Sequence, residues 1–178
     1  GTLVLKVYYT RDTYDVEVLG NNTKAGTFTN ESNTYKYDKV ITLSVTTNPG
    51  YTFLGWFNGE SLACENSTFT FNVDKDITYT ATWEANKDTP YKVEYYFENI
   101  ADSNYTVDNT LTIDKKGTTD TPTETAEVKT FTHFTFNQNK SVLDGNINGD
   151  GSTVLKVYYT RDTYDVEVLG NNTKAGTF

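Results

Sequence analysis

Hydrophobic and polar residues alternate along most of this chain, and a period of two residues is typical of half-buried β-strands. Near the start, Tyr14, Val16 and Val18 share one face, while the acidic residues between them share the other. The same alternation predicts strands at residues 4–10 and 154–160, which carry the same segment VLKVYYT. It also predicts strands with the inward-facing sets Ile41, Leu43 and Val45; Phe69, Phe71 and Val73; Ile77, Tyr79, Ala81 and Trp83; and Tyr91, Val93, Tyr95 and Phe97. Since no window shows a sustained helical period, we expect a mostly β protein with little helix.

The chain repeats itself. Residues 4–28 return residue for residue as residues 154–178, an offset of 150 residues (154 minus 4). Such identity exceeds what a shared fold demands, and it indicates recent tandem duplication of a long unit. We therefore expect the chain to be one period of a longer array plus the opening of the next. Residues 158–166 run from one β-type segment into the next without Gly or Pro, which predicts a stiff junction.

Turn-forming segments and the repeat together suggest domain boundaries. The polar stretch 86–90 ends in proline, which has no N–H group to donate to a continuing ladder, and we expect a linker there. One domain is then expected at residues 13–86 and a second at 87–162. Residues 1–12 would close a preceding repeat, and residues 163–178 would start the next. In the alternative, the unit begins at the duplicated segment, whose first copy forms one long strand of the first domain.

Composition and charge narrow the function classes. The chain has 178 residues, of which 36% are hydrophobic and 15% aromatic, enough for one or two compact domains. Its formal net charge of -9 lacks the positive footprint that binds nucleic acid or anionic membranes. No apolar run reaches the roughly 20 residues of a membrane span, so we expect no membrane insertion. The single cysteine, Cys64, cannot close an intramolecular disulfide, and stability must come from packing.

The segment PGYTFLGWFNGE, followed by STFTFNVDKDITYTATW, resembles the InlB B-repeat family, also called the Listeria-Bacteroides repeat. The hallmark of that family is Gly-Tyr-x-Phe-x-Gly-Trp followed by a closing strand that ends in Ala-x-Trp. The matching residues here are Gly50, Tyr51, Phe53, Gly55, Trp56, Ala81 and Trp83. The resemblance implies a small β-grasp-like domain, and we expect a structural core formed by Tyr51, Phe53, Trp56 and Trp83. Cys64 stands where the family commonly has Ser or Thr.

The second candidate domain opens with YKVEYYFEN and closes with GNINGDGSTVLKVYYTR. These two segments resemble the MucBP-like repeats that alternate with B-repeats in surface proteins of Gram-positive bacteria. The resemblance implies a second small β-grasp-like domain in tandem with the first. It does not establish mucin binding.

One loop has calcium-ligand spacing. Asp144, Asn146, Asn148 and Asp150, with a glycine after Asn148, match the start of an EF-hand loop. Its closing glutamate is replaced by Leu155, and no helices flank the loop. A hairpin turn is therefore the preferred interpretation, with calcium as the alternative.

No set of residues supports catalysis or a cofactor. His133, the single histidine, lies in FTHFTF and is expected on the solvent face of a strand, opposite Phe134 and Phe136. One imidazole without Cys or His neighbours makes neither a zinc site nor a catalytic triad. The sequence near Cys64 offers no group that would activate the thiol. We therefore expect no enzyme, no cofactor and no metal.

Adjacent tyrosines occur at Tyr8 and Tyr9 and at Tyr95 and Tyr96. In each pair one ring should face a core and its neighbour should face outward. The outward rings could stack on sugars or pack against a neighbouring domain. We favour domain packing because the pairs lie beside the junctions.

Two functional hypotheses follow. The first is a tandem-repeat stalk unit of a cell-wall-anchored adhesin, extracellular, whose partners are adjacent copies of the same repeat. The second is a repeat module that itself binds host glycan or protein with avidity from the tandem copies. Binding of an isolated unit to a glycan array would separate the two hypotheses.

Overall fold

The computed structural model describes residues 1–29 and 31–169. The chain divides into two compact units, and the division falls within two of its strands. The first unit comprises residues 1–91, 115–123 and 146–153, and the second comprises residues 92–114, 124–145 and 154–178. Thirteen strands and no helix occur in the described residues. The expectation of a mostly β protein is confirmed, while the β-grasp architecture and the domain boundaries stay predictions.

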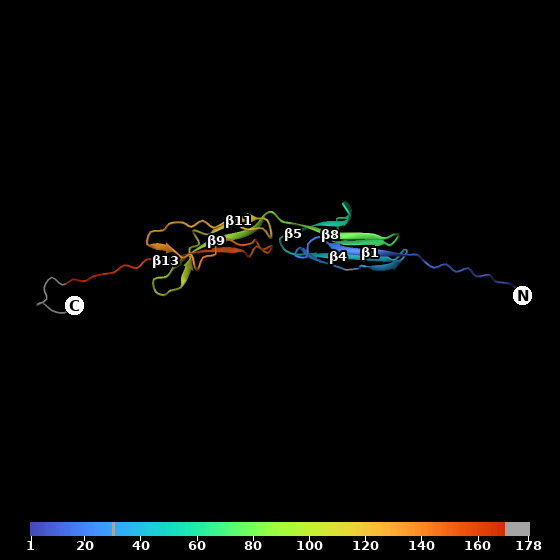
Figure 1. Cartoon of the computed structure of the whole chain (residues 1–178), viewed down its shortest axis with the longest axis horizontal. Coiled ribbons are helices and arrows are strands. Elements are labelled where there is room, and N and C mark those ends of the chain that lie inside the picture. Colours follow the sequence, from blue (N-terminus) through green and yellow to red (C-terminus); the bar gives the residue numbers. More distant parts are fainter. Residues whose placement is uncertain (30, 170–178) are drawn as a thin grey trace. The chain divides into compact units, whose positions relative to one another are not determined.

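The larger sheet of the first unit has five strands. In spatial order they are β3 (Asn33–Lys36), β1 (Thr13–Gly20), β8 (Ile77–Ala85), β5 (Tyr51–Asn58) and β6 (Ser61–Cys64). The central pair, β1 and β8, is parallel, and the other neighbours are antiparallel. Figure 1 shows β1 and β8 side by side. β1, which the alternation at residues 14–18 predicts, therefore lies in the interior of a sheet and is hydrogen-bonded on both edges.

A smaller antiparallel sheet completes the first unit. It contains β2 (Gly26–Phe28), β4 (Val40–Thr47) and β7 (Thr68–Asn72), in that order. One buried cluster takes side chains from both sheets: Val16, Val18, Ala25, Ile41, Leu43, Trp56, Val73, Ala81 and Trp83. Within β1, β4 and β8 the members of this cluster lie two residues apart, as alternation predicts for strands with one face toward a core.

The sheet that contains most of the second unit has the order β10 (Tyr105–Val107), β9 (Thr89–Glu98), β13 (Val154–Arg161) and β12 (Phe134–Phe136). β11 (Ile113–Gly117) also pairs with β9. β13 and β9 are parallel, and β12 runs antiparallel to β13. Val93, Tyr95, Leu155, Val157 and Tyr159 are buried, so the alternation predicted for both strands is again observed.

The expected linker at residues 86–90 is largely structured. The Asn86 N–H donates to Gly50 O (2.8 Å), and Asn86 O accepts from the Thr119 N–H (3.0 Å), all within the first unit. β9 already begins at Thr89, so the proline at position 90 belongs to the strand. The sequence-based interpretation was wrong for Thr89 and Pro90, because a proline is tolerated near the start of a strand.

Residues 4–10 do not form the strand that their alternation predicts. Alternation gives a strand one apolar face, but a strand also needs a neighbour for its N–H and C=O groups. No ladder partner for this segment occurs among the described residues. No helix within the described residues is long and apolar enough to cross a membrane.

Candidate interaction surfaces and the duplicated segment

The first half of the duplicated segment is the central strand β13 in its second copy. One edge of β13 pairs in parallel with β9, from Val154 opposite Lys92 to Tyr159 opposite Phe97. The other edge pairs with β12, and a further bridge joins Lys156 to Val142. β13 is thus hydrogen-bonded on both edges and lies in the interior of its sheet.

The buried face of β13 contacts a cluster of aromatic rings. Tyr159 lies 4.9 Å from Phe131 and 5.4 Å from Phe97, measured between ring centroids. Its hydroxyl donates to Lys129 O at 2.7 Å. Burial is the main cause that raises the pKa of Tyr159 above its ordinary value. Tyr95 lies on the same face and is fully buried, with its hydroxyl donating to Glu127 O.

The opposite face of the same sheet carries a second aromatic group, made of Tyr96, Tyr105 and Tyr158. Tyr96 stacks on Tyr158 with centroids 4.8 Å apart, and Tyr105 meets Tyr158 edge-on at 5.2 Å. The Tyr96 hydroxyl donates to Glu94 Oε2. That hydrogen bond, together with burial and the negative charge of Glu94, raises the pKa of Tyr96 to about 12. The outward tyrosines in this unit therefore pack on one another across neighbouring strands.

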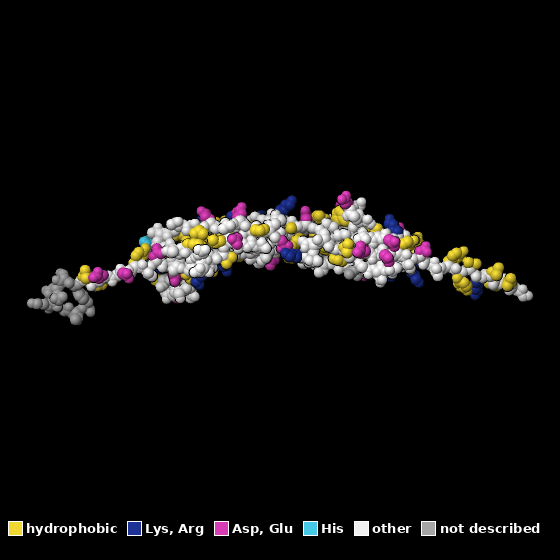
Figure 2. Space-filling view, viewed as in Figure 1, with side chains coloured by type: hydrophobic (Ala, Val, Ile, Leu, Met, Phe, Trp, Pro, Cys, Tyr) yellow, Lys and Arg dark blue, Asp and Glu magenta, His cyan; other side chains and the backbone are white. Residues whose placement is uncertain are grey.

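In the first copy, residues 4–10 present the same side chains to solvent. Leu5, Val7 and Tyr9 are 84%, 74% and 91% exposed, whereas the matching Leu155, Val157 and Tyr159 are 1%, 0% and 1% exposed. Tyr8 is exposed as well. Figure 2 shows hydrophobic side chains along this N-terminal segment. Identical residues therefore occupy opposite environments in the two copies.

The second half of the duplicated segment shows the reverse. In the first copy it forms β1, whose Val16 and Val18 are buried. In the second copy the matching Val166 and Val168 are exposed, and residues 163–169 form no strand. The rest of that predicted repeat start, residues 170–178, lies outside the described residues. In the first copy the second half of the segment forms a strand of the first unit, and in the second copy the first half forms a strand of the second unit.

A single residue, Asp12 or its copy Asp162, separates the two halves. In the second unit the Asp162 N–H donates to His133 O (3.0 Å), and its carboxylate accepts from the Thr135 hydroxyl (2.8 Å). In the first unit Asp12 O accepts from the Tyr37 N–H (2.7 Å). One copy of this aspartate is therefore held through its N–H group, and the other through its carbonyl.

The loop with calcium-ligand spacing is hydrogen-bonded as a turn. The Gly151 N–H donates to Asn148 O, and Gly151 adopts a φ of 75°, in the left-handed region that favours glycine. Asp150 Oδ1 accepts from the Ser152 N–H, and Asn146 O accepts from the Thr153 hydroxyl. Hydrogen bonds from Ser152, first from its side chain and then from its N–H group, hold the pKa of Asp150 below its ordinary value. Asp144 is exposed. The described residues contain no group of three His, Cys, Asp or Glu side chains that could hold a metal ion.

The sequence predicts His133 on the solvent face of a strand, but the structure places it in a tight turn. It precedes β12 with a φ of 65°, and Phe131 bridges to Phe134 across it. Its Nδ1 lies 2.9 Å from the Tyr164 hydroxyl. The alternation in FTHFTF did not reveal the turn because His tolerates positive φ better than most residues. Cys64 is a half-buried free thiol at the end of β6.

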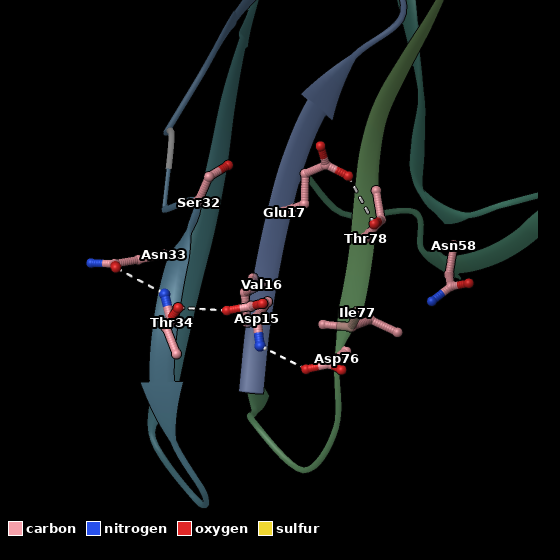
Figure 3. A pocket seen from close by; sticks show the side chains of 10 residues that line it. All are labelled: Asp15, Val16, Glu17, Ser32, Asn33, Thr34, Asn58, Asp76, Ile77 and Thr78. Atoms are coloured by element: carbon pink, nitrogen blue, oxygen red, sulfur yellow. Dashed lines mark hydrogen bonds between the residues drawn. The ribbon is translucent and has the colours of Figure 1, made fainter. Parts of the chain in front are cut away.

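A shallow depression lies over β1, β3 and the start of β8 (Figure 3). Its carboxylates are engaged within the protein. Asp15 accepts from the Thr34 hydroxyl, Glu17 accepts from the Thr78 hydroxyl (3.0 Å), and Asp76 accepts from the Asp15 N–H (2.8 Å). These bonds tie neighbouring strand edges together and account for the acidic residues here without a ligand.

Two of the four expected core residues are buried and two are half-buried against the core. Trp56 and Trp83 are buried, while Tyr51 and Phe53 are half-buried and pack against the buried cluster. Phe53 meets both indole rings, with centroids 6.0 Å from Trp56 and 5.5 Å from Trp83. The Trp83 Nε1–H donates to the Thr47 hydroxyl at 2.9 Å.

Sequence reasoning missed a polar network in the first unit. The Tyr51 hydroxyl donates to Asp120, which also lies 3.6 Å from Lys24 Nζ. Burial, the hydrogen bond to Asp120 and its negative charge raise the pKa of Tyr51 to about 12. A Cβ on Gly50 would lie 2.3 Å from Gly149 Cα, so the two backbones approach closely. Residues this far apart in sequence carry no local signal that they meet.

Comparison with known families finds a match over the first unit. Residues 14–87 match the family model described as a divergent InlB B-repeat domain, which spans nearly all of β1 to β8. InlB B-repeat domains are repeat domains that occur in bacterial surface proteins. A search of curated proteins finds no match to this chain. The MucBP-like resemblance of the second segment stays a prediction. The first resemblance is confirmed, and the chain carries a divergent InlB B-repeat domain at residues 14–87.

Proposed function

We propose that this chain is a tandem-repeat structural unit in the stalk of a cell-wall-anchored adhesin of a Gram-positive bacterium. The unit would hold a distal binding domain away from the cell wall, and its partners would be adjacent copies of the same repeat. No catalytic role is part of the proposal. The match to a B-repeat domain and the internal duplication both support a repeat unit.

The observation that carries the proposal is the way the duplicated segment divides at one aspartate. In an array, β13 of one repeat would run to Arg161, and β1 of the next would start one residue after Asp162. The N–H of this aspartate is bonded in the closing domain, and the carbonyl of its copy is bonded in the opening domain. A joint with both peptide groups held has few free dihedral angles. Such a joint resists bending, as a stalk requires.

The connection between strands β8 and β9 also supports the proposed role in a stalk. Only residues 86–88 separate β8 from β9. Asn86 forms hydrogen bonds within the first unit through its N–H, its carbonyl and its side chain. Its side-chain oxygen Oδ1 accepts from the Thr52 hydroxyl at 2.7 Å. The connection is therefore short and restrained rather than a flexible polar linker.

Small-angle X-ray scattering on chains of one, two and three periods tests the proposal. With stiff joints, the radius of gyration should nearly double from one period to two. A compact assembly would raise it by a factor of about 1.3, and a flexible chain by about 1.5. Either of these smaller factors would contradict the stalk.

A matched pair of insertions shows whether the aspartate joint is responsible. Six Gly-Ser residues placed between Arg161 and Asp162 of a two-period chain should lower the radius of gyration. The same insertion beside Ile100, in an exposed loop, should leave it nearly unchanged. Equal effects of the two insertions would show that the joint does not set the stiffness.

Surface location has its own test. Antibodies raised against this chain should label intact cells of the source bacterium, and enzymatic digestion of the cell wall should release the labelled protein. Labelling that requires permeabilised cells would contradict the proposed location.

A further inference from the structure

The chain contains two Asn-Gly dipeptides, Asn58-Gly59 and Asn148-Gly149, and the structure holds them differently. Both asparagine side chains are exposed. Asn-Gly bonds are prone to deamidation, because glycine has no Cβ to hinder the attack of its backbone nitrogen on the asparagine side chain. Which of the two bonds reacts in the folded protein therefore depends on how firmly each one is held.

The first dipeptide, Asn58-Gly59, lies at the tip of the hairpin formed by β5 and β6. Asn58 pairs with Ser61, so Gly59 and Glu60 form a two-residue loop, and these four residues are exposed. Within residues 1–29 and 31–169, neither the Asn58 side chain nor the Gly59 N–H group has a hydrogen-bond partner. In Figure 3 no dashed line joins Asn58 to its neighbours. A Cβ built on Gly59 meets no atom within 4 Å.

The hairpin that carries this dipeptide is weakly anchored. β6 has four residues, lies at the edge of its sheet and pairs, among the described strands, with β5 alone. A register irregularity between Trp56 and Phe57 interrupts this pairing. Short edge segments with few buried contacts open locally at a low free-energy cost. The hairpin can therefore bring the Gly59 nitrogen to Asn58 Cγ without unfolding of the first unit.

The second dipeptide, Asn148-Gly149, is held by its neighbours. The Asn148 N–H donates to the Thr153 hydroxyl (2.8 Å), and its side-chain Nδ2 donates to Ser152 Oγ (3.1 Å). A Cβ on Gly149 would lie 2.2 Å from Pro49 O, so the backbone around this glycine is tightly packed. Deamidation at Asn148 would first have to break these contacts.

We propose that Asn58 is a site of spontaneous deamidation in the folded protein and that the fold protects Asn148. The backbone nitrogen of Gly59 attacks Asn58 Cγ and loses its proton, the bond from Cγ to Nδ2 breaks, and ammonia leaves with that proton. Water then opens the resulting succinimide ring at either carbonyl, which gives aspartate or isoaspartate. The reaction needs only water as a co-reactant, and the inference does not depend on the stalk function.

The modification changes both the charge and the backbone of the hairpin. At neutral pH each event adds one negative charge to a formal net charge of -9. The new carboxylate lies at the depression that Asp15, Glu17 and Asp76 also line. Isoaspartate also inserts a methylene group into the main chain at the end of β5, where residue 58 pairs with Ser61. The tip of the hairpin should then loosen, while the buried Trp56 keeps its place in the core.

Timed incubation of the full-length chain in mildly alkaline buffer, followed by tryptic peptide mapping with mass spectrometry, tests the proposal. Trypsin releases Asn58 within residues 40–75 and Asn148 within residues 141–156, and fragmentation spectra locate the converted residue. An isoaspartyl methyltransferase detects the isoaspartate product. Asn58 should convert faster than Asn148 by about tenfold or more, which corresponds to about 1.4 kcal/mol in activation free energy. A rate at Asn58 no higher than the rate at Asn148 would overturn the proposal.

Three controls separate the effect of the fold from that of the dipeptide. In urea the two rates should approach each other, because both bonds are then unrestrained. Ser152→Ala removes the acceptor of Asn148 Nδ2, so it should raise the rate at Asn148 and leave the rate at Asn58 unchanged. Gly59→Ala should lower the rate at Asn58 by about tenfold, because its Cβ hinders the attacking nitrogen. A preference for Asn58 that persists undiminished in urea would show that flanking sequence sets the rates, which would contradict the proposal.

Discussion

Replacement of Trp83 by alanine tests the packing of the first unit. Trp83 is buried near the end of β8, where its ring contacts Phe53 and lies against Gly26, and its Nε1–H donates to Thr47. The substitution removes the largest side chain of this strand from a cluster that joins both sheets. We expect it to be the most damaging single change in β8.

The magnitude follows from the area that the ring buries. An aromatic side chain buries about 150–250 Å², which at about 25 cal/mol per Å² corresponds to about 4–6 kcal/mol. Residual compactness of the unfolded chain lowers this by about 10–40%. The expected loss of unfolding free energy is then about 3–5 kcal/mol, the usual range for removing a buried tryptophan. Thr47 is exposed, so water can replace its lost hydrogen bond.

Urea unfolding followed by tryptophan fluorescence measures the effect. The chain has two tryptophans, and Trp56 remains as the reporter of the first unit when Trp83 is replaced. Trp83→Phe should retain more than half of the lost stability, and Tyr37→Ala, at an exposed position, should change it by about 0.5 kcal/mol or less. An unchanged urea midpoint for Trp83→Ala would refute the assignment of this residue to the core.

Three further predictions concern backbone strain, pH and calcium. Gly50→Ala should destabilise the first unit by more than about 2 kcal/mol, because its φ is 83° and a Cβ would meet Gly149, whereas Gly59→Ala, at a φ of 56° with open space around it, should cost about 1 kcal/mol. The pKa of Tyr51 and of Tyr96 is raised from 10.0 to about 12, so the folded state holds these protons more tightly than the unfolded state. The stability that these two groups contribute is fully present below pH 10.0 and should be lost as pH rises through about 12. The loss should be shallower in the two Tyr→Phe variants. Melting temperatures with EDTA and with excess calcium should coincide, because the loop at residues 144–152 is bonded as a turn; a rise of several degrees with calcium would contradict this.

Much of the fold could be predicted from the alternation of side chains. Val16 and Val18, Ile41 and Leu43, and Tyr95 lie buried where a period of two placed them. This signal is reliable because a strand with one face toward a core must alternate. The identity of the core tryptophans followed from the family resemblance, which the match to residues 14–87 bears out.

The features that sequence reasoning missed depend on partners or on backbone angles. The segment VLKVYYT predicts a strand in both copies, but only the copy beside β9 and β12 forms one. His133 lies within an alternating pattern, yet its positive φ makes a turn. The bond between Tyr51 and Asp120 joins residues far apart in sequence. Local patterns do not encode which distant segments meet.

The division of the duplicated segment at Asp12 is the central claim, and trimming residues 1–11 tests it most directly. The shortened chain keeps β1 and the bond from the Tyr37 N–H to Asp12 O. Among the hydrogen bonds and ion pairs of the described residues, it loses the exposed contacts of Arg11 with Tyr37 O (3.3 Å) and Asp38 (4.0 Å), which are worth about 0–1 kcal/mol.

Urea unfolding followed by the fluorescence of Trp56 and Trp83, both in the first unit, gives the outcome. We predict that the unfolding free energy of the first unit changes by about 1 kcal/mol or less. Loss of most of that stability would show that residues 4–18 act as one strand of the first domain and would contradict the division at Asp12.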